Sequence, residues 1–179
     1  YGHNPAAINM IGKFVDQMQV SGRKTAVVTF PGDRTDELIE ESVKLLPKHF
    51  THFIVKQDDN RRGRPSGEVA ELIRSLLIKH GTKAENIEII LDEQEAVNKA
   101  LSSAVEGDYV VVFADKVSRC WKQITSFKSE GNTRMKEVDT RAEDHLLDRV
   151  EVDLISDAIS NATIRTDKRG VIIEVEEEN

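Results

Sequence analysis

The chain has 179 residues and a formal net charge of -7, so its overall charge gives no reason to expect binding to nucleic acid or to an anionic membrane. Its single cysteine, Cys120, excludes an internal disulfide framework and a cysteine-cluster zinc site. No apolar run approaches the ~20 residues that cross a bilayer, and we expect a cytoplasmic protein with no membrane contact. The length fits one domain with an appendage, and the first residue, Tyr1, favours a chain that begins inside a longer polypeptide or has been processed.

The amino-terminal segment is predicted to be a loop that leads into a helix. Asn4 is a good N-cap, and Pro5 suits the first helical position. Apolar residues from Ile8 to Met18 recur at helical spacing and give this helix one buried face. The free N-H groups at the start of the helix could contact a phosphate near His3 and Asn4. The competing interpretation is an ordinary helix cap beside a surface histidine.

An apolar strand at residues 24–30 runs into a polar loop and then a helix, and this plan repeats along the chain. Residues 50–55 form the next predicted strand, and residues 57–65 form its loop. The two loops share a mixture of acidic and basic side chains, namely Asp33, Arg34 and Asp36 in or after the first and Asp58, Asp59, Arg61 and Arg64 in the second. Loops at the carboxyl ends of parallel strands line one rim of a sheet, where ligands bind.

Acidic and basic groups at one rim suit a small zwitterion. A guanidinium can take a carboxylate in a two-point contact, and carboxylates can hold an ammonium or a guanidinium. The simpler interpretations stay open, in which Asp33 is only a helix cap, a role that Thr35 could equally take, and residues 57–65 form only a solvated loop. The pattern assigns no catalytic residue and no metal ligand.

Two further strands are predicted at residues 87–91 and 109–114. Asp92 with Glu95 resembles a capping box for the helix between them. Alternation of strands and helices predicts an α/β fold of the Rossmann-like kind, with a mostly parallel sheet and helices on both faces. We expect Leu38 to face that sheet. We expect the side chains of Cys120 and Trp121 to lie in the core and to take no part in catalysis.

The composition of the chain becomes polar and charged after about residue 127. We predict one domain at residues 1–127 and a carboxyl-terminal extension at residues 128–179, which begins with a charged linker or surface helix. Within the extension, residues 162–165 and 171–175 flank a turn and predict a β-hairpin that could add an antiparallel edge. His145 has acidic neighbours at Asp144 and Asp148, but this pattern is typical of an exposed charged helix.

Three segments together resemble the carboxyl-terminal domain of the Mur ligase family, and most of all its cyanophycin synthetase branch. Residues 1–7 resemble the family's Asp-Tyr-x-His-Asn-Pro signature without its leading Asp. Residues 31–37 resemble its Gly-Asp-Arg-x-Asp loop. Residues 58–64 stand where the amino-acid-adding peptidoglycan ligases have Asp-Asn-Pro-Arg, and their Arg-Gly-Arg ending is closer to cyanophycin synthetase. The resemblance covers about residues 1–127.

This resemblance implies ATP-dependent amide bond formation, in which a carboxylate becomes an acyl phosphate and an amine attacks it. In the family, this domain closes over ATP and Mg held by an upstream central domain. The implied partners are an incoming amino acid, arginine in the cyanophycin branch, and a poly-aspartate acceptor. His3 and Asn4 would lie near the nucleotide. The implied amino-acid pocket comprises Asp33, Arg34, Asp36, Asp58, Asp59, Arg61 and Arg64.

The chain contains no Gly-x-x-x-x-Gly-Lys-[Ser/Thr] phosphate loop, so these residues alone are expected to be inactive. We also expect a homo-oligomer. The rival hypothesis is a noncatalytic Rossmann-like module that binds a small ligand or a partner protein. A dinucleotide oxidoreductase is disfavoured because no strand is followed by a Gly-x-Gly-x-x-Gly turn.

Overall fold

The computed structural model describes residues 4–18, 20–128, 162–167 and 170–175. The chain divides into two compact units, Tyr1–Thr133 and Arg134–Asn179. Among the described helices, none combines the length and the apolar character needed to span a bilayer.

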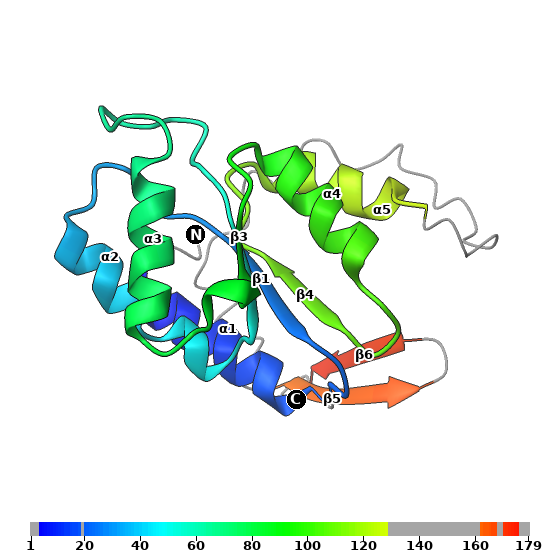
Figure 1. Cartoon of the computed structure of the whole chain (residues 1–179). Helices are drawn as coiled ribbons and strands as arrows, with labels where there is room; N and C mark the ends of the chain where they lie inside the picture. Colours follow the sequence, from blue (N-terminus) through cyan, green and yellow to red (C-terminus); the bar gives the residue numbers. More distant parts are fainter. Residues whose placement is uncertain (1–3, 19, 129–161, 168–169, 176–179) are drawn as a thin grey trace. The chain divides into compact units, whose positions relative to one another are not determined.

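A four-stranded parallel sheet forms the centre of the first unit (Figure 1). Its strands lie in the order β3-β2-β1-β4, so β1 lies in the interior of the sheet, between β2 and β4. In the register, Ala26 of β1 lies between Phe53 of β2 and Val111 of β4. The strands are β1 (Lys24–Val28), β2 (His52–Val55), β3 (Ile87–Ile89) and β4 (Tyr109–Val112). The predicted α/β fold with a parallel sheet is therefore confirmed.

Helices cover both faces of this sheet. On one face lie α1 (Pro5–Gln17), α2 (Asp36–Val43) and α3 (Glu68–Lys79), whose buried residues pack with Ala26 and Val28. On the other face lie α4 (Glu93–Ser103) and α5 (Val117–Ser126), which pack around Val27 and Ile54. Side chains alternate between the faces along a strand, so consecutive residues of β1 enter different clusters. Short 3-10 turns occur at Leu46–Lys48 and Ala84–Asn86.

The predicted strands are longer than the observed ones. β1, β3 and β4 each end two residues earlier than predicted, and β2 begins two residues later. Phe30 and Phe50 account for two of these differences, because both side chains are buried in the core although both residues lie outside a strand. A run of apolar residues indicates which residues are buried. In this sheet the buried residues extend beyond the last hydrogen bond between neighbouring strands.

Side-chain caps fix where several helices begin. The Asn4 Oδ1 accepts a hydrogen bond from the Ala7 amide at 2.9 Å, and Asp92 accepts one from the Glu95 amide at the same distance. Both predicted caps are confirmed. Thr35, rather than Asp33, caps α2 through the Leu38 amide. Asp33 is thereby left for contacts with other loops.

Two predictions about buried side chains are wrong. Leu38 is 45% exposed, because α2 buries Ile39, Ser42 and Val43 instead. Trp121 is 60% exposed, whereas its neighbour Cys120 is buried as predicted. In α2 the neighbour Ile39 takes the buried position predicted for Leu38, whereas in α5 only one of the two predicted core residues is buried.

In the second unit, β5 (Ala162–Asp167) and β6 (Gly170–Val175) pair antiparallel in a two-stranded sheet of their own. Ile164 lies opposite Ile173 in this ladder. The predicted hairpin is therefore present. Most of the predicted charged segment, including His145 and its acidic neighbours, lies outside the described residues.

Candidate functional site at the strand-end rim

Two loops at the carboxyl ends of β1 and β2 are tied together. We call residues 29–35 the first rim loop and residues 56–67 the second rim loop. Arg64 of the second loop donates hydrogen bonds to the carbonyl oxygens of Gly32, at 3.1 Å, and of Arg34, at 2.8 Å. A side chain at Gly32 would collide with the Arg61 carbonyl oxygen, so this close approach requires glycine. The two loops therefore form one continuous surface.

Ion pairs neutralise several of the predicted pocket residues. Arg62 lies 2.7 Å from Asp33, and Arg64 lies 2.7 Å from Asp36 and 2.9 Å from Glu68. The hydrogen bonds that Arg64 donates to Asp36 and Glu68 raise its pKa. Each pair is partly exposed and contributes about 0 to 1 kcal/mol alone, so their effect is on loop geometry more than on global stability.

Two cations at this surface stay available for a ligand. Among the residues that the structure describes, Arg34 and Arg61 have no side-chain hydrogen bond or ion pair. Arg61 also lines a small pocket between the loops, together with Asp58. The other residues around that pocket are Phe30, Gly32, Gln57, Arg64, Pro65 and Val69. Opposite charges in one pocket can hold both ends of a zwitterion.

A cluster of charged side chains that reaches into the core contacts the second rim loop at Asp59. Its centre is formed by the buried side chains of Lys56, Glu93 and Asp115, and it continues outward through the partly exposed Arg119 to Asp59 at the surface; we call these five residues the buried charge cluster. The Lys56 side chain is fully buried, and its ammonium lies 2.9 Å from Glu93 and 2.8 Å from Asp115. A buried ammonium is costly unless it is paired, so two carboxylates are the expected partners.

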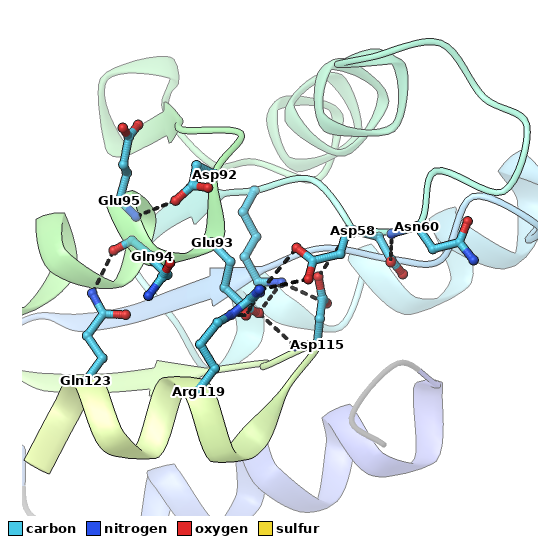
Figure 2. A network of polar contacts seen from close by, with 11 residues as sticks. Asp58, Asn60, Asp92, Glu93, Gln94, Glu95, Asp115, Arg119 and Gln123 are labelled. Carbon is cyan, nitrogen blue, oxygen red and sulfur yellow. Dashed lines mark hydrogen bonds and ion pairs between the residues drawn. The ribbon is translucent and has the colours of Figure 1, made fainter.

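Figure 2 shows how Glu93, Asp115 and Arg119 point toward one another from three separate segments. The Asp115 amide donates to Glu93 Oε1 at 2.7 Å, and Arg119 Nε donates to Glu93 Oε2 at 3.0 Å. Burial by itself would raise the pKa of Glu93. The hydrogen bonds from the Asp115 amide, Lys56 and Arg119 outweigh burial and lower this pKa to about 2.

Arg119 also reaches Asp59 in the second rim loop. Its two terminal nitrogens lie 2.8 and 3.1 Å from the two Asp59 carboxylate oxygens, which is a two-point contact. The Asp59 amide donates to Asp115 Oδ2 at 3.2 Å. Hydrogen bonds with Asp59 and Glu93 raise the pKa of Arg119. The loop is thus attached to α5 and to the end of β4.

The structure brings together most of the predicted site residues but not all of them. Five of them lie on the joined rim loops, namely Asp33, Arg34, Asp58, Arg61 and Arg64, and Asp36 follows at the start of α2. The Asp59 side chain turns instead to the buried charge cluster. His3 lies outside the described residues. The Asn4 side chain caps α1, so its oxygen already has a donor.

Four members of the buried charge cluster were not predicted as site residues, namely Lys56, Glu93, Asp115 and Arg119. Each carried a usable signal. Lys56 directly follows an apolar strand, at a position where a charge is costly, and Glu93 opens the helix that follows the next strand. Arg119 lies four residues after Asp115 at the same rim. Grouping the charged residues that follow the ends of the predicted strands would have indicated this cluster.

The described residues do not by themselves form a site for a metal ion. They contain no group of three or more histidine, cysteine or acidic side chains placed to hold one. Cys120 is equally unsuited, because burial, and next the nearby Glu93, raises the pKa of its thiol to about 12.

Comparison with known proteins decides the family. The sequence profile described as "Mur ligase, glutamate ligase domain" matches residues 1–115, which is more than half of the chain. The chain belongs to this Mur ligase family. The α/β fold and the resemblance predicted from three motifs are both confirmed.

Cyanophycin synthetases are among the most similar relatives of this Mur ligase domain. It is 40% identical over 131 residues to the enzyme of Synechocystis sp., covering 73% of this chain and 15% of that protein. It is 42% identical over 124 residues to the enzyme of Nostoc sp., covering 69% of this chain and 14% of that protein. The chain therefore spans about one seventh of the length of these relatives.

A solved relative carries the same fold. The structure of UDP-N-acetylmuramoyl-L-alanyl-D-glutamate--2,6-diaminopimelate ligase superposes with a TM-score of 0.50 and 26% identity, covering 65% of this chain and 23% of that chain. The Mur ligase domain is thus a domain type found within longer ATP-dependent ligases.

Proposed function

We propose that this Mur ligase domain is the substrate-closing part of an ATP-dependent ligase that joins an amino acid to a carboxylate. The incoming amino acid is arginine, and the acceptor is an aspartate side chain of a poly-aspartate backbone, as the motif resemblance to the cyanophycin synthetase branch implies. Residues 1–127 form this domain and residues 128–179 extend it. The whole protein is a cytoplasmic homo-oligomer.

The pocket between the rim loops carries this proposal. Asp58 and Arg61 both line this pocket, which has room for only about one water molecule, so arginine would lie against its mouth, between a residue that suits its guanidinium and one that suits its α-carboxylate. A carboxylate suits the guanidinium of the substrate, while Arg61 and Arg34 suit its α-carboxylate or the acceptor's carboxylate. Asp33 and Asp36, whose charges are paired with Arg62 and Arg64, shape the pocket by fixing the loops. Asp59 acts on the same loop from the buried cluster.

ATP and Mg enter as cosubstrate and cofactor held mainly by other domains of the complete polypeptide. The described residues hold no metal-binding group, and the chain has no phosphate loop. His3 and the start of α1, with Asn4, would lie near the nucleotide, as the resemblance of residues 1–7 to the family's signature implies. No step is assigned to residues of this domain beyond binding and orienting the amino acid, which is a large share of catalysis in ligases of this kind.

The test uses the complete polypeptide with ATP, Mg and an aspartyl peptide. Arginine is expected to start ADP release, and its binding measured by titration calorimetry is expected to tighten when ADP and Mg are present. Citrulline is the matched control ligand, because it has the shape of arginine without the guanidinium charge. Absence of ADP release, together with no coupling between arginine and ADP, would contradict the proposal.

A further inference from the structure

Asp59 belongs to the second rim loop, yet its carboxylate is held by a residue 60 positions later in the chain. We propose that Arg119 is a positioning residue, which fixes the second rim loop through Asp59 and so sets the pocket for the incoming amino acid. The expected effect of Arg119 on the kinetics of amino-acid addition rests on the proposed function. The structural part of the inference does not, because loop order can be measured without turnover.

Arg119 has a fixed orientation from which to act. Its Nε donates to Glu93, whose carboxylate is almost completely buried and also accepts from the Asp115 amide and from Lys56. A planar guanidinium held on one side by Glu93 presents its terminal nitrogens in one direction only. Asp59 meets those nitrogens with both carboxylate oxygens. The anchor of the loop is therefore built on the core of the domain.

The backbone of the second rim loop is strained at one residue, so contacts from outside the loop help to hold its conformation. Arg62 has a φ of 50°, in the left-handed region that non-glycine residues rarely adopt. The Asp58 side chain accepts from the Asn60 amide at 2.8 Å, and the Asn60 side chain accepts from the Arg62 amide at 3.1 Å. These contacts hold consecutive residues to one another. Arg64 ties the end of the loop to the first rim loop, and at Asp59 the loop is held on the domain by Arg119 and by the bond from the Asp59 amide to Asp115.

Asp59 lies inside that chain of local contacts. Asp58 precedes it in the pocket, and Arg61 follows two residues later. A shift of the Asp59 backbone would therefore move both pocket charges at once. A misplacement of about 1 Å at a positioned group can cost about a hundredfold in rate, so a distant anchor can matter to substrate binding.

The experiment compares variants of the complete polypeptide. Arg119→Ala removes the anchor, Arg119→Lys keeps the charge but cannot make the two-point contact with Asp59 while bonded to Glu93, and Asp59→Asn removes the charge at the loop. Lys122→Ala is the matched control, since it removes a cation from the exposed face of the same helix. The first readout is amide hydrogen exchange of residues 57–65, and the second is the KM for arginine beside kcat and the KM for ATP.

Arg119→Ala and Asp59→Asn are expected to speed exchange of residues 57–65 by about tenfold or more, as for loss of a charge-assisted contact. The KM for arginine should rise by about tenfold or more while the KM for ATP stays unchanged, and Arg119→Lys should recover part of both effects. The double variant should lose no more than either single variant. Lys122→Ala should behave as wild type.

Unchanged exchange of residues 57–65 in Arg119→Ala would overturn the inference, as would an equal rise of KM for both substrates. If Arg119→Ala does not fold, Asp59→Asn decides the matter, because Asp59 is a surface side chain. If the wild type shows no turnover, the proposed function fails, while the exchange data still decide whether Arg119 orders the loop.

Discussion

The guanidinium of Arg64 lies 2.8 Å from the carbonyl oxygen of Arg34, so a side chain of the second rim loop supports the backbone of the first. The same guanidinium donates to the Gly32 carbonyl oxygen and pairs with Asp36. Since Arg64 supplies contacts to both loops, it acts as a structural link at the edge of the pocket rather than as a free cation for a ligand.

Replacing Arg64 with alanine is expected to lower the free energy of unfolding by about 1 to 3 kcal/mol, because two backbone acceptors and two carboxylates lose a charged donor. Chemical denaturation of wild type and variant measures this difference. Arg64→Lys should recover only part of it, since a single ammonium cannot reach all four partners. A variant as stable as wild type would show that the rim loops are held by other contacts.

Arg34 and Arg61 are expected to behave in the opposite way. Neither side chain has a partner in the part of the chain that the structure describes, so alanine at either position should change the free energy of unfolding by less than about 0.5 kcal/mol. Turnover of the complete polypeptide should nevertheless fall by about a hundredfold or more. Lys44→Ala, which removes an exposed lysine from the end of α2, is the control. Full activity in both arginine variants would argue against a ligand site here.

Removing the buried ammonium of Lys56 is expected to be severe. Lys56→Met leaves Glu93 and Asp115 buried without their shared cation, which costs about 3 to 5 kcal/mol of stability. The free energy of unfolding from urea titration measures the loss. Lys122→Met, an exposed lysine replaced in the same way, should stay within about 0.5 kcal/mol of wild type. Equal stability of the two variants would mean that the buried cluster contributes nothing to folding.

Acid should destabilise the domain through Glu93. Its pKa is about 2 in the folded chain and near 4.5 in the unfolded chain, so the unfolded state takes up the proton first as the pH falls. The stabilisation is complete above about pH 5 and disappears as the pH approaches 2. The difference between these pKa values corresponds to about 3 kcal/mol.

Unfolding free energies measured from pH 7 down to pH 3 test this pH dependence. Glu93→Gln should be less stable than wild type at pH 7 and should show a flatter profile, because it has no carboxylate to protonate. Glu106→Gln, at an exposed position, should retain the wild-type profile. A Glu93→Gln variant with the full acid dependence would assign that dependence to other groups.

Cys120 is expected to be unreactive in the folded protein. Burial raises its pKa to about 12, so almost no thiolate exists near pH 8. Iodoacetamide labelling followed by peptide mapping should show slow modification of Cys120 that speeds up on denaturation. Cys120→Ala should retain turnover. Rapid labelling of the native protein, or loss of turnover in a folded Cys120→Ala variant, would contradict this expectation.

The sequence predicted the strands, the order of loops and helices, and the meeting of two charged loops at one rim. It did so because apolar runs and caps such as Asn4 and Asp92 are local signals. The helix faces were less predictable. In α2, Leu38 and Ile39 are both apolar, and only packing on the sheet decides that Ile39 is buried.

The partners of the charged residues were not predictable from local patterns. Asp33 and Arg62 lie 29 positions apart, and Asp59 and Arg119 lie 60 positions apart. Such pairs depend on how loops fold over the rim, which no spacing rule specifies. The burial of Lys56 has the same origin, because its two carboxylates arrive from the start of α4 and the end of β4.

Product formation tests the ligase assignment most directly. The complete polypeptide is incubated with ATP, Mg, arginine and an aspartyl peptide, and the peptide is analysed by mass spectrometry. We predict a peptide heavier by one arginine residue, with the product reduced by about a hundredfold or more in Arg61→Ala. A peptide of unchanged mass with the wild type, or equal product with Arg61→Ala, would contradict the account.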